Sequence, residues 1–358
     1  MTPKILVTGA AGFIGFHMVK KLCASGYQVV GIDNLNSYYD PELKKGRLAE
    51  SGINAGPLKE NELVTSAKFP SYRFAKLDIR DKSALEKLFN TEGFDYVLHL
   101  AAQAGVRYSI THPDEYISCN ITGFYNILEC CRHWPVKHLL FASSSSVYGN
   151  RTEVPFREDI PVDKPVSLYA ATKKSNELMA YTYSHLYRVP LTGLRFFTVY
   201  GPWGRPDMAY FSFSEKITNG EPISIFNNGN LQRDFTYVDD IVDAIERLVN
   251  KPETEKEAEP GVKGSALYRI LNIGHSDPVV LDTFIRELEK QLQLEAIRIN
   301  KPMQAGDVLT TYADVSALES IIGKMKHTSL TDGLGRFVKW YRAYKNLPVP
   351  ENADKSAV

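Results

Sequence analysis

The feature that most constrains the fold of this chain is a glycine-spaced stretch near its amino terminus. Gly9-Ala-Ala-Gly12-Phe13-Ile14-Gly15 follows a short apolar run and leads into residues with helical apolar spacing. Glycines at this spacing permit a tight turn, a close approach of the backbone to a pyrophosphate, and close packing of the helix on the strand. The N–H groups at the start of the helix can then bind phosphate oxygens. The stretch therefore predicts a Rossmann-type dinucleotide site.

Polar residues end the second and third predicted strands. Asp33 lies about 20 residues beyond the glycine stretch, where a Rossmann domain places the carboxylate that binds the adenosine ribose. A carboxylate there repels a 2′-phosphate, so the sequence favours NAD over NADP. Asn34 and Asn36 belong to the same predicted cofactor contact. Asp78, with Ile79 beside it, either reaches the adenine edge or caps the helix that follows.

The fourth predicted strand ends in small residues. Leu100, Ala101, Ala102 and Gln103 stand in sequence at this strand end. Small side chains there leave room for a dinucleotide to lie across the ends of the strands. We therefore include these four residues in the predicted cofactor site.

Strand-like and helix-like runs alternate through the first half of the chain. This order predicts an α/β fold, a Rossmann-type doubly wound parallel sheet with helices on both faces. A smaller C-terminal α/β substrate domain is expected to follow. The predicted strands cover residues 5–8, 28–33, 72–77, 96–101, 138–143 and 192–197, and the predicted helices cover residues 13–25, 81–90, 115–133 and 170–188.

The domain organisation follows from this order. Residues 1–195 are predicted to form the NAD-binding domain, with a returning segment at about 234–275. Residues 196–233 and 276–345 are predicted to bind the substrate, and residues 346–358 to form a tail.

Two segments have no clear periodicity. Residues 49–70 are polar and carry Gly and Pro, and residues 251–264 are rich in Glu and end in Pro-Gly. We expect both to be surface loops, with partner binding as the alternative.

A tyrosine and a lysine stand one helical turn apart. Tyr169 and Lys173 are expected on the same face of a helix. A nearby cation and the positive nicotinamide ring both favour the phenolate, which makes a tyrosine a usable general base at neutral pH. Ser143 to Ser146 end the preceding strand, and one of these hydroxyls can share a hydrogen bond with the phenol and the substrate. This constellation predicts acid–base chemistry beside a nicotinamide.

The bulk composition excludes several classes of protein. Lysine plus arginine equals aspartate plus glutamate at 42 each, so no overall field favours nucleic acid or an anionic membrane. The start lacks the pattern of a signal peptide, and a cytoplasmic protein is expected. No cluster of His, Cys or carboxylates suggests a metal, and the four cysteines are expected to be reduced core residues. They are Cys23, Cys119, Cys130 and Cys131.

Three residues that could suggest chemistry have simpler explanations. Asp239 and Asp240 precede an amphipathic helix, and we expect them to cap it. His99 sits late in an apolar strand, where a packed and hydrogen-bonded histidine is expected.

The motifs resemble those of the extended short-chain dehydrogenase/reductase family. The shared features are G-x-x-G-x-x-G, the serine cluster before Val147-Tyr148-Gly149, and Y-x-x-x-K, and the likeness covers essentially the whole chain. Within that family the chain is similar to the UDP-glucuronate 4-epimerases. The similarity is carried by Asp33-Asn-Leu-Asn-Ser-Tyr-Tyr-Asp40, Ala101-Ala-Gln-Ala-Gly-Val-Arg-Tyr-Ser109, Ser143-Ser-Ser-Ser-Val-Tyr-Gly149 and Arg195-Phe-Phe-Thr-Val-Tyr-Gly-Pro-Trp-Gly-Arg-Pro-Asp-Met208.

The resemblance implies a reaction without net redox change. Tyr169 takes the proton of the sugar 4-hydroxyl, NAD⁺ takes the C4 hydride, and the 4-keto sugar turns over and receives the hydride on its other face. Ser144 matches the catalytic hydroxyl of the family. The product from UDP-glucuronic acid is UDP-galacturonic acid. The resemblance also implies a homodimer that pairs helices near 115–133 and 170–188.

The sugar site is also implied by the resemblance. Dehydratases and decarboxylases of the family carry carboxylates where this chain has Ser145 and Ser146. Galactose-type epimerases carry Asn where this chain has Thr198, a smaller hydroxyl that leaves room for a carboxylate. Arg205 is the candidate donor to that carboxylate, or else a surface loop arginine.

The nucleotide contacts are less complete. Arg233 resembles the pyrophosphate-binding arginine of the family, with a salt bridge to a neighbouring Asp as the alternative. Asp307 resembles the ribose contact, or else belongs to a loop turn. Many family members carry a second arginine shortly before this point. The chain has Lys301, Met303 and Gln304 there.

The same motifs are compatible with other activities. A UDP-galactose or UDP-N-acetylglucosamine 4-epimerase would share most of these motifs, and decarboxylase or dehydratase chemistry uses the same fold. A catalytically idle NAD-binding regulator would be expected to lack Tyr169, Lys173 or the serine cluster.

Overall fold

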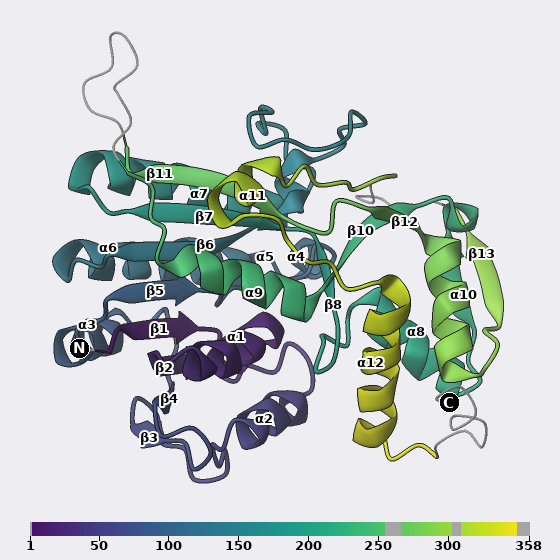
Figure 1. Ribbon diagram of the computed structural model, residues 1–358, viewed down its shortest axis with the longest axis horizontal. Coiled ribbons are helices and arrows are strands. Elements are labelled where there is room, and N and C mark those ends of the chain that lie inside the picture. Colours follow the sequence, from purple (N-terminus) through teal and green to yellow (C-terminus); the bar gives the residue numbers. More distant parts are fainter. Residues whose placement is uncertain (1, 255–265, 303–308, 349–358) are drawn as a thin grey trace.

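An eight-stranded sheet runs through the centre of the molecule. The structure is a computed structural model that describes residues 2–254, 266–302 and 309–348. The strand order is β11-β7-β6-β5-β1-β2-β4-β3, and every neighbouring pair is parallel except the edge pair β3–β4 (Figure 1). The strands are β1 (Lys4–Thr8), β2 (Gln28–Asp33), β3 (Leu63–Thr65), β4 (Tyr72–Lys76), β5 (Tyr96–His99), β6 (His138–Ser144), β7 (Leu191–Phe196) and β11 (Tyr268–Ile273).

Helices cover both faces of this sheet. α1 (Phe13–Ala24) and α9 (Val238–Val249) pack together on one face, and α3 (Lys82–Glu92), α6 (Phe124–His133) and α7 (Leu168–Tyr187) pack on the other (Figure 1). Two apolar clusters fill the layers between helices and sheet. Because both faces are covered, the central strands are buried along nearly their whole length. The predicted doubly wound α/β fold is confirmed.

The strand order reverses at β1. The chain extends the sheet through β2 to one side of β1 and through β5 to the other. In open parallel sheets the crossover helices then leave a crevice at the carboxyl ends of these strands, where ligands bind. This topology predicts a ligand site at the carboxyl ends of β1, β2, β5 and β6.

The C-terminal part adds two small sheets and three helices to one end of the large sheet (Figure 1). Their aromatic side chains join the apolar cluster that underlies α1 and α9, so the two parts share a continuous core. The sheets consist of β8 (Thr198–Tyr200), β10 (Gln232–Tyr237) and β12 (Pro278–Val280), and of β9 (Ile223–Phe226) and β13 (Arg298–Lys301), and the helices are α8 (Ala209–Thr218), α10 (Leu281–Leu292) and α12 (Leu330–Tyr344).

The returning segment predicted at 234–275 lies in three places. β10 pairs with β8 and β12 in the small sheet, α9 packs against α1, and β11 pairs with β7 at the edge of the large sheet. The short α11 (Ser316–Ile322) packs near α9 and β11. The chain therefore crosses between the two parts several times.

One prediction of local structure was wrong. The segment 49–70 is not a simple loop, because it completes α2 (Pro41–Glu50) and contributes the edge strand β3. The helix expected at 115–133 is present, but it contains a π-helical turn η1 (Ile117–Gly123) between α5 (Pro113–Tyr116) and α6. A π turn widens the helix by one residue, which apolar periodicity does not reveal. Most of the predicted loop 251–264 lies outside the described residues.

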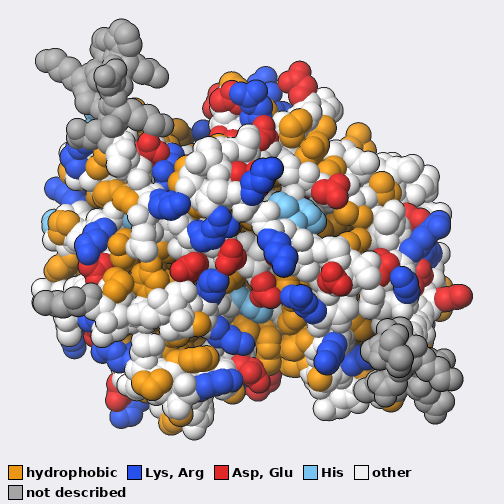
Figure 2. Space-filling view, in the orientation of Figure 1, with side chains coloured by type: hydrophobic (Ala, Val, Ile, Leu, Met, Phe, Trp, Pro, Cys, Tyr) orange, Lys and Arg blue, Asp and Glu red, His pale blue; other side chains and the backbone are white. Residues whose placement is uncertain are grey.

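Figure 2 shows positive and negative side chains interspersed over the face that carries α9 and α12. Of the described helices, none is long and apolar enough to cross a membrane. All four cysteines are free, as predicted. Cys130 and Cys131 are buried in the core, and Cys23 and Cys119 are partly buried and pack against it.

Candidate functional site

A cavity of about 1110 Å³ opens at the carboxyl ends of the strands, between the large sheet and the C-terminal part. It brings together every predicted site residue that the structure describes, with one exception. The exception is Asp78, and Asp307 lies outside the described residues. Residues far apart in sequence thus form one continuous site.

The glycine loop leaves space for a ligand at one end of the cavity. Gly9 has a φ of +70°, and a Cβ there would stand 2.9 Å from the Ala101 nitrogen. A Cβ at Gly15 would overlap the Gly9 carbonyl oxygen. Gly12 caps α1 without a side-chain hydrogen bond, and no acidic residue occupies the first helical turn. The open N–H groups and the bare backbone fit a pyrophosphate.

The far end of this groove carries a buried ion pair. The Asp33 carboxylate accepts the Leu35 backbone N–H at 2.8 Å and pairs with the Lys44 ammonium at 3.3 Å. Lys44 also donates to the Asn36 side-chain oxygen at 3.0 Å. Sequence reasoning missed Lys44 because α2 was not predicted. Its position 11 residues after Asp33, within a polar stretch, gave no distinguishing signal.

Asp78 supports the groove without lining it. Its carboxylate accepts the Asn34 amide at 2.9 Å and pairs with Arg80, and these hydrogen bonds hold the pKa of Asp78 below its ordinary value in spite of burial. The alternative that Asp78 caps the following helix was wrong, because Asp81 is the cap of α3. The π turn η1 supports Gln103 in a similar way. Asn120 in this turn accepts the Gln103 backbone N–H and donates to the Gln103 carbonyl oxygen.

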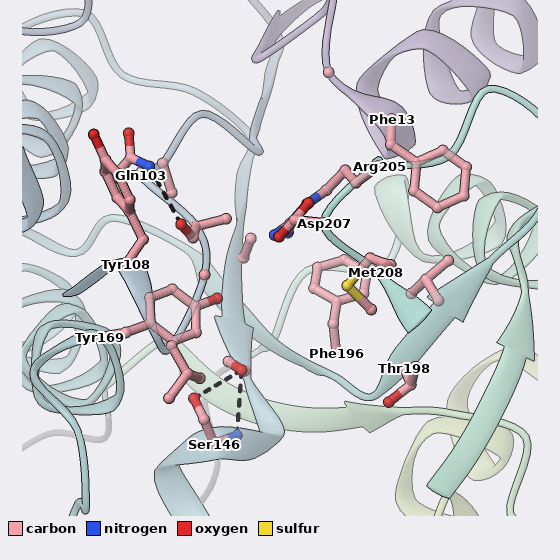
Figure 3. Close-up of a pocket in the computed structure, with 18 of the residues that line it drawn as sticks. Phe13, Gln103, Tyr108, Ser146, Tyr169, Phe196, Thr198, Arg205, Asp207 and Met208 are labelled. Atoms are coloured by element: carbon pink, nitrogen blue, oxygen red, sulfur yellow. Dashed lines mark hydrogen bonds and ion pairs between the residues drawn. The ribbon is translucent and has the colours of Figure 1, made fainter. Parts of the chain in front are cut away.

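The predicted catalytic residues meet at the middle of the cavity. Tyr169 and Lys173 lie one turn apart on α7, and Ser144 ends β6 and lines the same cavity. Figure 3 shows Tyr169 beside Ser146. The Ser144 hydroxyl oxygen accepts the Ser146 hydroxyl at 2.9 Å and the Ser146 N–H at 3.2 Å. The Lys173 ammonium donates to the Ala142 carbonyl oxygen at 2.8 Å and lies 6.0 Å from the centre of the Tyr169 ring.

The electrostatics of this centre differ from the expected pattern. Burial raises the pKa of the Tyr169 phenol, and the positive charge of Arg205 and a hydrogen bond with Ser144 offset only part of that rise. Burial also lowers the pKa of Lys173 to about 8. The Arg205 charge therefore lowers the pKa of the Tyr169 phenol and adds a second cation to the Lys173 ammonium predicted beside it.

A buried network fixes the end of β6. The Glu177 carboxylate accepts the Ser143 hydroxyl at 2.7 Å and pairs with Arg195 through two hydrogen bonds. Arg195 continues to the Tyr148 hydroxyl at 3.0 Å, which donates to Asn272 at 2.7 Å. The Ser143 hydroxyl is thereby engaged with Glu177, and Ser144, Ser145 and Ser146 line the cavity beside it.

The opposite wall carries Arg205 and Asp207, which stand across the cavity from Tyr169 (Figure 3). Asp207 accepts the Arg205 Nε–H at 3.0 Å and the Tyr38 hydroxyl at 3.1 Å. Among the described lining residues, five cations face two carboxylates, an excess that suits an anionic ligand in a chain of zero net charge. The cations are Lys44, Arg107, Lys173, Arg205 and Arg233.

Comparison with known proteins identifies the family of this chain. Residues 5–274 match the model of the NAD dependent epimerase/dehydratase family, which is most of the chain. The chain belongs to that family. Its fold and NAD as its cofactor follow from this membership, and the bare glycine loop and Asp33 described above suit that cofactor.

Individual relatives cover nearly all of this family member. It is 50% identical to protein CapI of Staphylococcus aureus, over 95% of this chain and 99% of that protein. It is 43% identical to a probable UDP-glucuronate 4-epimerase of Rhizobium meliloti, over 94% and 96% respectively. A crystal structure of UDP-glucuronic acid 4-epimerase from Bacillus cereus, in complex with UDP-glucuronic acid and NAD, matches with a TM-score of 0.81 and 31% identity, over 95% of this chain and 99% of the other.

The remaining predicted residues of this epimerase/dehydratase line the C-terminal end of the cavity. Thr198 begins β8, and Arg233 lies in β10, where it donates to the Gln232 and Leu309 carbonyl oxygens. Sequence reasoning did not single out several lining residues here and at the groove, although most lie in motifs that carried the resemblance. They are Tyr38, Tyr39, Lys44, Arg107, Tyr108, Asp207, Phe213 and Phe226.

The structural roles predicted for His99, Asp239 and Asp240 are confirmed only for the histidine. His99 is buried and shares a hydrogen bond of 2.8 Å with Thr8, and burial lowers its pKa to about 3, as a packed neutral histidine requires. Asp239 and Asp240 lie in the first turn of α9 but do not cap it, since Tyr237 is the cap residue. Asp240 instead accepts the Thr328 N–H at 2.7 Å. The described residues contain no group of three or more potential metal ligands.

Proposed function

We propose that this protein catalyses the 4-epimerisation of UDP-glucuronic acid to UDP-galacturonic acid, through a transient 4-keto sugar. The observation that carries the proposal is the wall opposite Arg205. There Tyr169 lies beside Ser146 (Figure 3), and Ser144 and Ser145 line the same wall, with no carboxylate among its described residues. The names of the Rhizobium meliloti and Bacillus cereus relatives support the same substrate.

The proposed chemistry centres on the Tyr169 phenol. When bound along the glycine loop and Asp33, NAD⁺ would supply a positive charge and a reversible hydride acceptor for oxidation and reduction at sugar C4. Tyr169 takes the proton of the 4-hydroxyl as that oxygen becomes a carbonyl, and later gives it back. Ser144 orients the same oxygen, because its hydroxyl already accepts from Ser146 and faces the phenol. Lys173 holds the helix face to the end of β6 through Ala142.

The sugar carboxylate is proposed to lie between Arg205 and the hydroxyls of Thr198, Ser145 and Ser146. Arg205 provides a charge-assisted hydrogen bond, and the hydroxyls satisfy the remaining lone pairs. Held in this way, the bond from C5 to the carboxyl carbon would lie near the plane of the 4-keto group. Loss of carbon dioxide needs that bond perpendicular to the plane, so the arrangement would preserve the carboxylate.

The alternatives use residues that this wall lacks. Decarboxylation or 4,6-dehydration by the family pattern would need a carboxylate at position 145 or 146, and both are serines. Epimerisation of UDP-galactose or UDP-N-acetylglucosamine would leave Arg205 without a substrate anion. A substrate with a carboxylate uses more of the charged wall than a neutral sugar does.

We also propose that the protein acts as a homodimer that pairs α6 and α7 with those of a second copy. Large apolar side chains are exposed on these helices, in keeping with a covered surface. They are Tyr125, Leu178, Tyr181, Leu186 and Tyr187. Size-exclusion chromatography with light scattering is expected to give twice the mass of one chain, and a particle of one chain's mass at micromolar concentration would exclude this dimer.

The proposed reaction is tested by incubating the protein with UDP-glucuronic acid, without added reductant, and following the sugar proton signals by NMR. The expected result is UDP-galacturonic acid from the wild type, with a loss of roughly a thousandfold in kcat for Tyr169→Phe. Turnover of UDP-galactose without turnover of UDP-glucuronic acid would refute the substrate. A UDP-pentose as the main product would refute the reaction.

A further inference from the structure

Arg47 is a buried cation outside the cavity. It lies in α2, its side chain is fully shielded from solvent, and it has no carboxylate partner among the described residues. A buried guanidinium is costly unless each of its N–H groups finds an acceptor. All five do, and each acceptor is a neutral oxygen. These hydrogen bonds fix the relative positions of the segments that supply the acceptors.

The acceptors of Arg47 come from the two ends of the site. One Nη donates to the carbonyl oxygen of Ala11, inside the glycine loop, at 2.9 Å and to the Tyr39 hydroxyl at 2.7 Å. The Nε and the other Nη donate to the Trp203 carbonyl oxygen at 3.0 and 2.7 Å. The second Nη also reaches the Gly204 carbonyl oxygen at 3.2 Å. One side chain thus joins the glycine loop to the two residues before Arg205.

The turn that Arg47 holds is conformationally unfavourable. Trp203 has a φ of +59°, in the left-handed region that a large side chain seldom adopts. Its indole packs over Gly46, where a Cβ would stand 2.8 Å from the ring, and against Phe16 in α1. Such a conformation persists only when surrounding contacts hold it. The two hydrogen bonds to the Trp203 carbonyl oxygen are among those contacts.

We propose that Arg47 is a positioning residue that fixes the loop 202–207 against the glycine loop and so places Arg205 opposite Tyr169. The proposal deepens the proposed function and rests on it for the identity of the substrate. The planar guanidinium suits this task because it donates in several directions at once. Lysine, with one ammonium on a flexible stem, cannot reach all four acceptors. The cofactor and substrate ends would then keep a common geometry through residues that touch neither ligand.

The test compares Arg47→Gln and Arg47→Lys with a matched control, Lys45→Gln, which removes an exposed charge from the same helix. For Arg47→Gln, KM for UDP-glucuronic acid is expected to rise roughly tenfold or more, since a misplacement of about 1 Å has large kinetic effects. The pH profile of kcat should shift to higher pH, because the Arg205 charge lowers the pKa of Tyr169. The KM and pH profile of Arg47→Lys should lie between those of the wild type and Arg47→Gln. Those of Lys45→Gln should match the wild type.

Calorimetry with UDP separates a local effect from a general loss of structure. The affinity for UDP is expected to stay within about twofold, because Arg47 contacts no lining residue of β9 or β10 and lost hydrogen bonds act mainly on their own partners. If KM and the pH profile of Arg47→Gln match the wild type while only its melting temperature falls, the positioning role is refuted.

A second variant keeps the proposal testable if Arg47→Gln does not fold. Gly46→Ala leaves the guanidinium in place but pushes the Trp203 ring, and the same rise in KM and shift in pH profile are expected. Unchanged KM in this variant would contradict the proposal. If the wild type epimerises a different UDP-sugar, the proposed substrate is wrong, but the same series measured with that sugar still tests Arg47.

Discussion

The two ends of the cavity differ in the kind of surface that they present, backbone at one end and side chains at the other. At the cofactor end, the glycine loop and the small strand-end residues present backbone, and their close approach leaves no space for added carbons. At the substrate end, Arg205, Asp207 and the serine hydroxyls present charged and polar side chains from two separate segments. A backbone surface tolerates almost no change in volume, whereas a side-chain surface tolerates changes of shape but not of charge.

This difference suits what each end has to do. A dinucleotide that stays bound through a reaction without net redox change needs a site of constant shape, which parallel strands and a helix N-terminus provide. A sugar that must turn over between two hydride transfers needs contacts that can be broken and remade. Hydroxyls and a single guanidinium are suited to that exchange.

The largest effect is expected from a single added carbon at the cofactor end. Gly15→Ala places a Cβ on the Gly9 carbonyl oxygen, so the loop must open and NAD affinity should fall roughly a hundredfold. The amount of NAD released when the purified protein is denatured measures this loss of affinity. Gly56→Ala is the control, because a Cβ there meets only the Asn54 side chain at 3.4 Å. Full retention of NAD by Gly15→Ala would break the contrast between the two ends.

A change of charge should matter most at the substrate end. Arg205→Gln is expected to raise KM for UDP-glucuronic acid roughly ten- to a hundredfold, the value of a charge-assisted hydrogen bond. NAD content should be unchanged. Arg336→Gln, which removes an exposed arginine from α12, is the control. If Arg205→Gln changed KM no more than this control did, the guanidinium would not be the carboxylate contact.

Lys173 lines the middle of the cavity, between the two ends. Removal of its charge is expected to increase the free energy of unfolding. Because its pKa is lowered to about 8, the buried ammonium opposes folding at neutral pH, and this cost disappears as pH rises from about 8 to the ordinary value for lysine. At pH 7 the free energy of unfolding of Lys173→Met should therefore exceed that of the wild type by about 1–2 kcal/mol. This figure already subtracts the loss of the hydrogen bond to Ala142.

Denaturant unfolding of Lys173→Met and the wild type, at pH 7 and at pH 10, measures this difference. The advantage of the variant should shrink at pH 10, and its epimerase activity should be lost at both pH values. A variant less stable than the wild type at pH 7 would mean that the ammonium has a stabilising partner in the folded protein.

The smallest effect is expected from one hydroxyl. Thr198→Ala should change KM by no more than about fivefold, since a neutral hydrogen bond contributes modestly. Its sharper signature is a UDP-pentose by-product in the NMR spectrum, from a carboxylate that is no longer held. Thr182→Ala, on the exposed side of α7, is the control. Without any by-product from Thr198→Ala, the proposed protection of the carboxylate would lose its support.

Local patterns predicted which residues gather around the glycine loop. The strand boundaries of β2 match the prediction, and the glycines, Asp33 and Gln103 line one cavity. These features can be predicted because strand period, helix start and glycine spacing are properties of short stretches. The same reasoning identified Tyr169, Lys173 and Ser144, since a strand end and the next helix meet at the same edge of a parallel sheet.

Long-range contacts were not predictable in this way. The sequence did not show that Lys44 pairs with Asp33, that Asp207 holds Arg205, or that Asp240 binds Thr328 in place of capping a helix. Nor did it indicate the π turn that carries Asn120 to Gln103. Each contact depends on where a second segment passes in space, and single-sequence periodicity contains no such information.

The sequence by itself determined the fold class, the cofactor end and the residues that meet at the end of β6, because each follows from local geometry repeated along a parallel sheet. Only the tertiary structure decided that the Arg205 charge lowers the pKa of the Tyr169 phenol, and that Arg47 ties the glycine loop to the turn before Arg205. Pairs such as Arg47 and Trp203 lie 156 residues apart. Their contact is set by the packing of the C-terminal part on the sheet, since only packing brings distant backbone into hydrogen-bond range.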